Sequence, residues 1–349
     1  MKKTTVAVLF GGCSTEYDVS LQSACSVIEN LSLEKYSVIL LGITRRGEWL
    51  KYSGDMSRIQ NDTWREHPSC VPAVISPDRS TRGILILHGG SITTISIDVA
   101  FPVLHGKNGE DGTVQGLLEL AGIPCVGCGM LSSALCMDKD MAHRLVRLAG
   151  IRTPRSIVLH SSISDEELSK RISHLQYPLF VKPANSGSSF GITRVFRQNG
   201  LTGAVSAAFQ HDRKVVIEEA VDGFEVGCAV IGDKTLTLGE IDEIELSQGF
   251  FDYTEKYTLK TSKIHTPARI DADTAERIRQ TASVIYRALG CRGFARVDLF
   301  LTSENEIVFN EVNTIPGFTT HSRYPNMLRE IGMTFTQIVD ELIRLAMQP

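Results

Sequence analysis

The chain has 349 residues, of which 42% are hydrophobic, and its net charge is −4 at pH 7. This length exceeds one ordinary domain, so we expect two or three structural units. A net charge of −4 is not the strongly basic balance typical of a nucleic-acid-binding protein. No apolar run approaches the roughly 20 residues that are needed to cross a membrane.

The first part of the chain alternates strands and helices. We expect strands at residues 5–10, 36–43, 97–104 and 124–127, with helices after Gly11-Gly12 and at 113–121. The N-terminal apolar run is too short for a secretory signal, so we expect a cytoplasmic protein. The polar segment 45–94 is interpreted as an irregular rim. Strands separated by helical crossovers predict a mostly parallel, doubly wound α/β domain over residues 1–128.

Two further units follow. A small α+β module is expected over 129–214, with helices at 138–149 and 165–175, the second capped by Ser164, and strands at 156–159, 179–182 and 192–196. A β-rich unit is expected over 215–349, with strands at 215–219, 224–231, 235–245, 295–301 and 306–312 and helices at 272–289 and 335–347. The polar stretch 247–263 is typical of a lid or binding loop.

Two strands of the last unit carry oxygen ligands. Glu311 and Asn313 alternate in V-F-N-E-V-N, and Asp298 lies in A-R-V-D-L-F. Alternate residues share a face, and a short turn would make the strands antiparallel, so the three side chains should converge. Such a set suits Mg²⁺ serving nucleotide phosphates. The alternative is a solvated polar face, which is weakened because each residue interrupts an apolar strand.

The run F-V-K-P-A-N-S-G-S-S-F-G joins a lysine, Lys182, to a small-residue loop. Gly187 and Gly191 would allow backbone N–H groups close to a phosphate, and Ser188 could donate its hydroxyl. The pattern is no Walker A loop, and a common Gly/Ser hairpin turn is the alternative. Lys139, in C-M-D-K-D, could by itself be an ordinary solvated residue.

The loop G-G-C-S-T-E puts Glu16 at the carboxyl end of the first sheet, where ligands bind in open α/β folds. An acid there suits a substrate ammonium; an acid favoured by a helix start is an equal alternative. His105, after the third strand, could line the same cleft. Cys125 and Cys128 form a C-x-x-C without a second metal-binding pair, so buried, reduced thiols are the preferred interpretation.

Six motifs in order resemble the ATP-grasp superfamily, and within it the D-alanine–D-alanine ligase family. They are F-G-G-C-S-T-E-Y-D-V-S, H-G-K-N-G-E-D-G, K-P-A-N-S-G-S-S-F-G, F-F-D-Y-T-E-K-Y, A-R-V-D-L-F and F-N-E-V-N-T-I-P-G-F-T. The resemblance covers essentially the whole chain, and it includes the D-alanine–D-serine ligases of the VanG type found in vancomycin resistance. It implies an ATP-grasp fold in which two α+β domains clasp ATP beside the N-terminal domain.

The resemblance implies roles for individual residues. ATP would contact Lys139, Lys182, Glu218, Glu225, Lys256 and Asn310. Two Mg²⁺ ions, or Mn²⁺ in their place, would bind Asp298, Glu311 and Asn313. The catalytic set would be Glu16, Ser188, Tyr257, Arg296, Gly317 and Ser322, and the amino acid substrates would meet His105, Asp242, Phe251 and Arg323.

Two positions bear on the second substrate. D-alanine–D-alanine ligases typically carry leucine where this chain has Arg323, and D-lactate-using relatives replace the lid tyrosine, Tyr257 here, by histidine. A polar pocket and a retained tyrosine imply a D-alanine–D-serine ligase for peptidoglycan precursors, acting as a cytoplasmic homodimer without a nucleic acid or membrane partner. The alternatives are a D-alanine–D-alanine ligase and a non-catalytic ATP-binding regulator.

Overall fold

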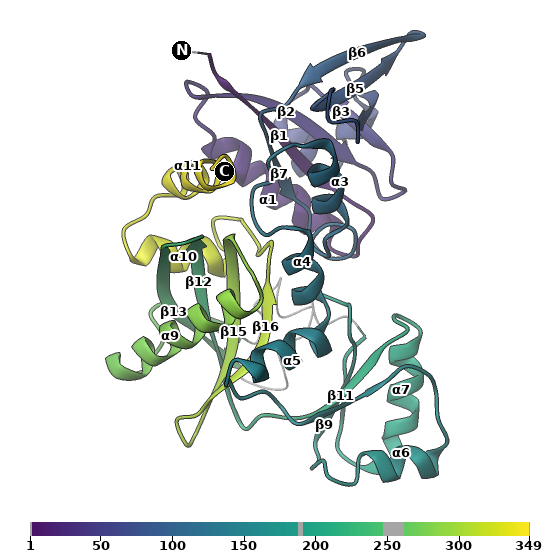
Figure 1. Cartoon of the computed structure of the whole chain (residues 1–349), viewed down its shortest axis with the longest axis vertical. Helices are drawn as coiled ribbons and strands as arrows, with labels where there is room; N and C mark the ends of the chain where they lie inside the picture. Colours follow the sequence, from purple (N-terminus) through teal and green to yellow (C-terminus); the bar gives the residue numbers. More distant parts are fainter. Residues whose placement is uncertain (1, 188–190, 247–261, 349) are drawn as a thin grey trace.

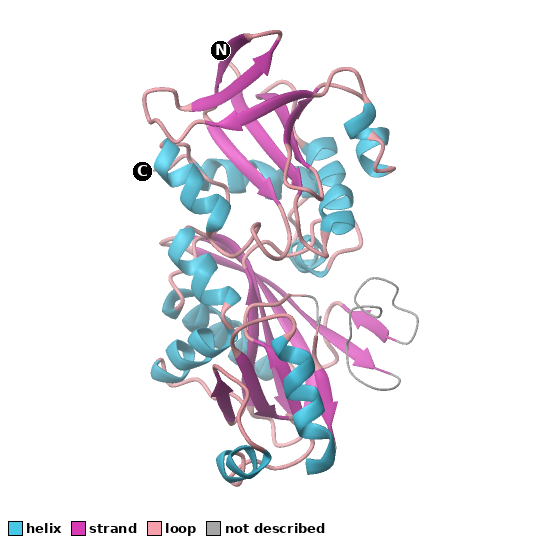
Figure 2. Cartoon of the chain, turned by 90° about the vertical axis from the view of Figure 1, so that its right-hand side faces the viewer, coloured by secondary structure: helices cyan, strands magenta, loops and turns pink. Residues whose placement is uncertain are grey.

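The computed structural model describes residues 2–187, 191–246 and 262–348, which form three sheets with helices packed around them (Figure 1). The N-terminal sheet lies at one end of the long axis and the four-stranded sheet at the other, with the five-stranded sheet between them. In Figure 2, turned by 90°, the N-terminal unit again lies at one end of the long axis. In the described part of the chain, no helix has the length and apolar character needed to cross a membrane.

The N-terminal sheet has seven strands in the order β6-β5-β4-β3-β2-β1-β7. The strands are β1 (Thr4–Gly11), β2 (Tyr36–Ile43), β3 (Trp49–Tyr52), β4 (Val71–Ile75), β5 (Gly83–His88), β6 (Ser91–Ser96) and β7 (Val99–Val103). Only β2, β1 and β7 run parallel; the remaining neighbours are antiparallel. The sheet is therefore mixed, and the prediction of a mostly parallel sheet was wrong for its outer half.

The segment predicted as an irregular rim forms that outer half. It contains four strands together with α2 (Met56–Gln60) and the 3-10 turn η1 (Trp64–Glu66). Gly89 and Gly90, both with positive φ, form a two-residue hairpin between β5 and β6. The strand expected at 124–127 is reduced to one bridge between Ala100 and Cys125, next to α3 (Thr113–Ala121).

The four-stranded sheet has the antiparallel order β10-β9-β11-β8. Its elements are β8 (Ser156–Leu159), α6 (Asp165–Arg171), β9 (Leu179–Pro183), β10 (Thr193–Val195), the 3-10 turn η2 (Gln198–Gly200), α7 (Leu201–Phe209) and β11 (Val215–Glu219). Ser164 caps α6 as predicted, since its side chain accepts the Glu167 N–H. Strand β11 pairs with β8 and β9, so this sheet extends past the boundary expected at residue 214.

The five-stranded sheet is antiparallel in the order β14-β13-β12-β15-β16. Its strands are β12 (Gly223–Gly232), β13 (Leu236–Leu246), β14 (Ser262–His265), β15 (Gly293–Thr302) and β16 (Ile307–Asn313). The helices around it are α4 (Met130–Met137), α5 (Lys139–Leu148), α9 (Ala272–Ala288), α10 (Arg323–Glu330) and α11 (Phe335–Ala346). The predicted antiparallel pairing of β15 with β16 is confirmed.

The largest apolar core joins the two ends of the sequence. Buried residues of β1 and of α1 (Tyr17–Asn30) share one cluster with Ile338, Leu342 and other residues of α11. Figure 1 shows α11 beside the N-terminal unit, and Lys35 donates to Asp340 at 2.6 Å. The C-terminal helix thus fixes the N-terminal unit against the five-stranded sheet.

Candidate active site

One row of residues crosses the face of the five-stranded sheet. Asp242 of β13 pairs with Gly227 of β12, and Gly227 pairs on its other side with Asp298 of β15. Asp298 in turn pairs with Glu311 of β16. Directly paired residues of neighbouring strands point to the same face, so three carboxylates and a glycine lie side by side. We call these four residues the cross-strand row.

Arg323, the first residue of α10, lies over Gly227 and joins carboxylates on both sides of it. Its Nε and Nη2 donate to the two oxygens of Asp242, both at 2.7 Å. Its Nη1 donates to Glu225 Oε1 at 2.9 Å and lies 3.4 Å from Asp298 Oδ1. A Cβ on Gly227 would lie 2.4 Å from Arg323 Nη2, so glycine leaves the space for this buried ion pair.

Asp298 is held by two further side chains. Arg296 donates Nε and Nη2 to the two Asp298 oxygens at 2.7 Å each, and the Asn313 amide nitrogen donates to Oδ2 at 2.8 Å. Arg296 pairs with Asn313 across the strands, two residues along from Asp298 and Glu311 and therefore on the same face. The residues predicted from strand alternation therefore do converge.

The same residues suit a divalent metal ion. Asp298, Glu311 and Asn313 offer carboxylate and amide oxygens, the ligands that Mg²⁺ prefers. Among the residues with a described position, no three His, Cys, Asp or Glu side chains form a group that could hold a metal ion by themselves. An ion here would therefore also draw on the Asn313 amide oxygen and on the oxygens of a bound ligand.

Both lysines that were predicted to contact ATP phosphates are buried. Lys139, at the start of α5, donates to the Ser186 carbonyl at 2.7 Å and lies 3.4 Å from Glu311 Oε2. Lys182 of β9 donates to Glu218 Oε1 of β11 at 2.5 Å, whereas Glu218 Oε2 is buried without a described hydrogen-bond partner. A buried carboxylate oxygen is costly unless a donor reaches it. Glu218 Oε2 therefore calls for a donor that no described residue supplies, and its predicted contact with ATP stays a prediction.

Glu16 lies where the N-terminal unit meets the small-residue loop after β9. A Cβ on Gly106 would lie 2.5 Å from Glu16 Oε2, and one on Gly187 would lie 2.9 Å from it. Glu110 Oε1 accepts the Gly106 N–H at 2.9 Å. Burial, together with the neighbouring Glu16 carboxylate, raises the pKa of Glu110 to about 8.

His105 forms a hydrogen bond to the backbone of the chain segment that contains Gly317. Its Nδ1 lies 2.9 Å from the Ile315 carbonyl, which can only accept, so Nδ1 carries a proton. Burial lowers the pKa of His105, which favours the neutral ring, and Nε2 then accepts from the Ser23 hydroxyl at 3.1 Å. Ser23 Oγ also accepts the Phe318 N–H at 3.2 Å. The ring thus supports this segment, and its contact with substrate stays a prediction.

The turn before α10 brings Ser322 beside Gly317, whereas Asn310 lies elsewhere, on β16. Ser322 Oγ accepts the Thr319 N–H at 3.0 Å and would lie 3.0 Å from a Cβ on Gly317. Asn310, on β16, accepts a hydrogen bond at its carbonyl from His143 Nε2 at 2.9 Å. Ser322 therefore lies directly beside the Gly317 backbone that is expected to bind an oxyanion.

Four predicted site residues lie outside the described part of the chain. They are Ser188, Phe251, Lys256 and Tyr257. The expected loop 247–263 lies outside it as well, except for its last two residues, which begin β14. The roles of these residues stay predictions.

Three residues of the site were not predicted. Gly227 interrupts an apolar strand, and a glycine inside a strand signals a close approach by another group. Glu110 lies in the quoted motif H-G-K-N-G-E-D-G, but its proximity to Glu16 depends on tertiary structure. Ser23 is an ordinary serine on a helix, and no sequence signal distinguishes it.

Known proteins are similar to this chain over its full length. Family models described as D-ala D-ala ligase N-terminus and C-terminus match residues 5–128 and 145–344. Vancomycin B-type resistance protein VanB of Enterococcus faecalis is 46% identical, with all of both chains covered. A D-alanine–D-alanine ligase of Caldicellulosiruptor bescii is 45% identical over the whole of this chain and 96% of its own.

A solved structure is similar as well. The crystal structure of VanG D-Ala:D-Ser ligase from Enterococcus faecalis has a TM-score of 0.92 and 57% identity, covering 99% of this chain and all of its own. Fold and site together define an ATP-grasp enzyme, an ATP-dependent ligase that forms a peptide bond and uses a divalent metal ion. The chain belongs to the D-alanine–D-alanine ligase family.

Proposed function

We propose that the chain joins D-alanine to D-serine at the expense of ATP and supplies this dipeptide to peptidoglycan precursors. The observation that carries the proposal is the bidentate Asp242–Arg323 pair beside Asp298. A D-alanine side chain needs only apolar contact, whereas the D-serine hydroxyl costs roughly 1–3 kcal/mol if it is buried unpaired. The pair offers that hydroxyl both an acceptor and a donor.

The first half of the reaction brings two anions together. An oxygen of the D-alanine carboxylate attacks the γ-phosphorus of ATP, the bond to ADP breaks, and a D-alanyl phosphate forms. Lys139 and Lys182, aided by Lys256, would neutralise phosphate charge. Two Mg²⁺ ions, with Mn²⁺ able to replace them, would supply further neutralisation when held by Asp298, Glu311 and Asn313. A closing 247–263 loop would exclude water from the acyl phosphate.

The second half forms the peptide bond. The deprotonated amine of D-serine attacks the acyl carbon, and phosphate leaves with its bonding electron pair. Glu16 would hold the ammonium of the first D-alanine, supported by Ser188 and Tyr257. Because Nε and Nη2 of Arg296 are engaged by Asp298, we assign Nη1 and the Gly317 N–H to the oxyanion.

Relatives in this family differ in their second substrate. Their names include D-alanine–D-alanine ligases and a putative D-alanine–D-lactate ligase of Streptomyces coelicolor. A D-alanine–D-alanine ligase is the second candidate, in which Arg323 would bind only the substrate carboxylate. We further propose a cytoplasmic homodimer and, by similarity to VanB and VanG, a role in vancomycin resistance.

The identity of the dipeptide tests the proposal. The purified chain would be incubated with ATP, Mg²⁺ and equal concentrations of D-alanine and D-serine, and the products separated by liquid chromatography and mass spectrometry. We expect D-alanyl-D-serine as the main dipeptide. Formation of D-alanyl-D-alanine alone would support the second candidate and contradict the proposal.

A further inference from the structure

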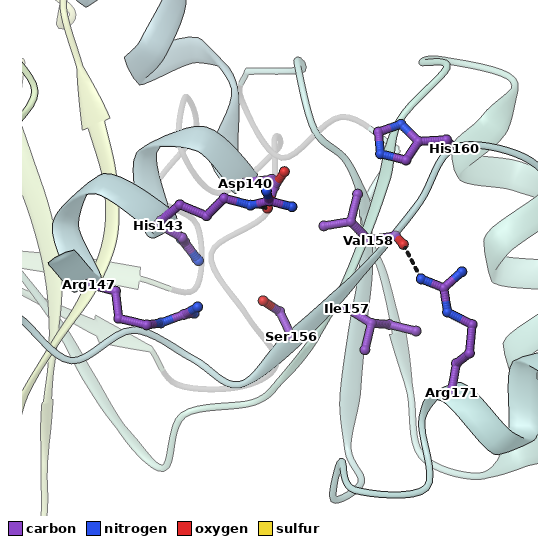
Figure 3. A pocket seen from close by; sticks show the side chains of 9 residues that line it. Asp140, His143, Arg147, Ser156, Ile157, Val158, His160 and Arg171 are labelled. Atoms are coloured by element: carbon purple, nitrogen blue, oxygen red, sulfur yellow. Dashed lines mark hydrogen bonds and ion pairs between the residues drawn. The ribbon is translucent and has the colours of Figure 1, made fainter.

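A cavity lies between α5 and the four-stranded sheet. Its volume is 460 Å³, and most of its wall comes from one face of α5, the outer strand β8, and Arg171 at the end of α6. In Figure 3, Arg147 and Arg171 extend into the space from opposite sides, with Ser156 and Ile157 between them. Of the residues with predicted catalytic, nucleotide-binding or metal-binding roles, none lines it.

The wall of this cavity carries an excess of positive charge. Its acid, Asp140, is already neutralised, because one oxygen accepts from Arg144 at 2.7 Å and the other lies 2.7 Å from Lys214 Nζ. Arg147 donates to the Thr153 hydroxyl, and Arg171 donates to the Val158 carbonyl. Neither guanidinium has a carboxylate partner in the described part of the chain. Two unneutralised cations that face one cavity favour a bound anion there.

His143 adds a hydrogen-bond acceptor to the same wall. Its Nε2 donates to the Asn310 carbonyl at 2.9 Å, and burial lowers its pKa, so Nδ1 is the unprotonated nitrogen. That atom is buried, and no described group donates to it. The side chain is 2% exposed and lines the cavity. A ligand with a hydroxyl group would satisfy it.

We propose that this cavity binds a small hydroxylated phosphomonoester. A phosphate group can accept from either Arg147 or Arg171 and is attracted by the other, and its charge of about −1.5 to −2 at neutral pH matches the two cations better than the single charge of a carboxylate. A hydroxyl on the carbon skeleton would donate to His143 Nδ1. The skeleton itself would lie on Val158, the apolar side chain that shares a face of β8 with Ser156.

Binding there should influence the nucleotide site. The cavity-facing helix α5 begins with Lys139, and Ser156 of β8 pairs in register with Glu218 of β11. A ligand that fixes α5 against β8 would therefore bias the positions of Lys139 and Glu218. By thermodynamic linkage, nucleotide binding would change the affinity for the phosphomonoester by the same factor.

Isothermal titration calorimetry of the full chain with ribose 5-phosphate tests the proposal, with ribose as the uncharged control ligand. The variant Arg147→Gln/Arg171→Gln removes both cations from exposed positions. Arg65→Gln/Arg329→Gln removes the same charge elsewhere on the surface and serves as the matched control. Circular dichroism would verify folding, and each titration would be repeated with a saturating non-hydrolysable ATP analogue at constant ionic strength.

We expect one site per chain for ribose 5-phosphate and none for ribose. Affinity should fall at least tenfold in the Arg147/Arg171 variant and stay unchanged in the control variant, and binding should persist beside the ATP analogue. Full displacement by the analogue, equal affinity in the two variants, or no binding up to about 10 mM would overturn the proposal. Because no D-amino acid takes part, this result is independent of the proposed ligase specificity.

Discussion

At the scale of single residues, Gly227 determines whether the Asp242–Arg323 pair can form. A methyl group there would lie 2.4 Å from Arg323 Nη2 and 2.7 Å from Asp242 Oδ1. We expect Gly227→Ala to lower the free energy of unfolding by about 1–3 kcal/mol, because the buried pair must separate. Urea unfolding would measure this, with Gly203→Ala in α7 as the control because its added methyl group meets open space. Equal stability of the two variants would contradict the packing argument.

Glu110 gives a pH dependence of stability with a definite sign. Its pKa is raised on folding from the ordinary 4.5 to about 8, first by burial and then by Glu16. Between these values the folded chain binds more protons than the unfolded chain, so Glu110 makes stability fall as pH rises. From pH 5 to pH 8, the free energy of unfolding should fall less in Glu110→Gln than in the wild type. The expected difference is about 1 kcal/mol or more.

Urea unfolding of the metal-free and nucleotide-free protein at both pH values would measure this difference. Glu34→Gln, which changes an exposed acid of the same unit, is the control and should follow the wild type. An unchanged pH dependence in Glu110→Gln would show that its carboxyl group is not perturbed on folding.

Ser23 joins His105 to Phe318 and so supports the Gly317 segment from the N-terminal unit. Ser23→Ala would leave His105 Nε2 and the Phe318 N–H without their shared partner, at a cost of about 1–3 kcal/mol in stability. If the Gly317 N–H stabilises an oxyanion, kcat should fall more than tenfold with little change in the KM for ATP. Ser26→Ala, on the same helix, is the control; a kcat equal to that of this control would remove the positioning role.

At the scale of elements, α11 belongs to the core of the N-terminal unit. Leu342 is fully buried in the cluster shared with β1 and α1. We expect Leu342→Ala to cost about 2–5 kcal/mol of unfolding free energy, since it opens a cavity in that core. Leu148, at the exposed end of α5, is the matched control and should cost less than about 0.5 kcal/mol when changed to alanine. Similar losses for both would contradict the shared core.

The elements that sequence predicted are those with a strong period. The helix expected at 272–289 is Ala272–Ala288, and the strands carrying Asp298 and Glu311 pair as their alternation implied. Strands β3 to β6 were missed although β4 (V-P-A-V-I) and β5 (G-I-L-I-L-H) are largely apolar, because the strands are short and the residues around them are polar and rich in turns. Helix α10 was missed because Pro325 suggests a break, although the first turn of a helix tolerates proline.

Only part of the site could be predicted from the spacing of residues in the sequence. Strand alternation was enough to bring Asp298, Glu311 and Asn313 together. The contact between Asp242 and Arg323 spans 81 positions, and spacing alone could not have indicated it; resemblance to the family did. The hydrogen bonds of Ser23 and the proximity of Glu110 to Glu16 arise only when separate units pack against each other.

At the scale of the whole molecule, each unit contributes to one site. The N-terminal unit provides Glu16, the four-stranded sheet provides Lys182, and the five-stranded sheet provides the cross-strand row. Glu16 lies against Gly187 of the loop after β9, and Lys139 links Ser186 to Glu311. Catalysis in this arrangement requires all three units in contact, whereas the proposed selection of the second substrate draws on the Asp242–Arg323 pair of the five-stranded sheet and α10.

Conservative variants of the Asp242–Arg323 pair would reveal whether this pair selects the second substrate. Arg323→Leu would leave Asp242, Glu225 and Asp298 without their shared cation, which costs about 3–5 kcal/mol for a broken buried pair, so Arg323→Lys and Asp242→Asn are the better changes. Steady-state kinetics would give kcat/KM for D-serine and for D-alanine as second substrate. We predict that the wild type prefers D-serine and that each variant lowers the D-serine to D-alanine ratio at least about tenfold, or ~1.4 kcal/mol. Equal losses for the two amino acids would contradict the account.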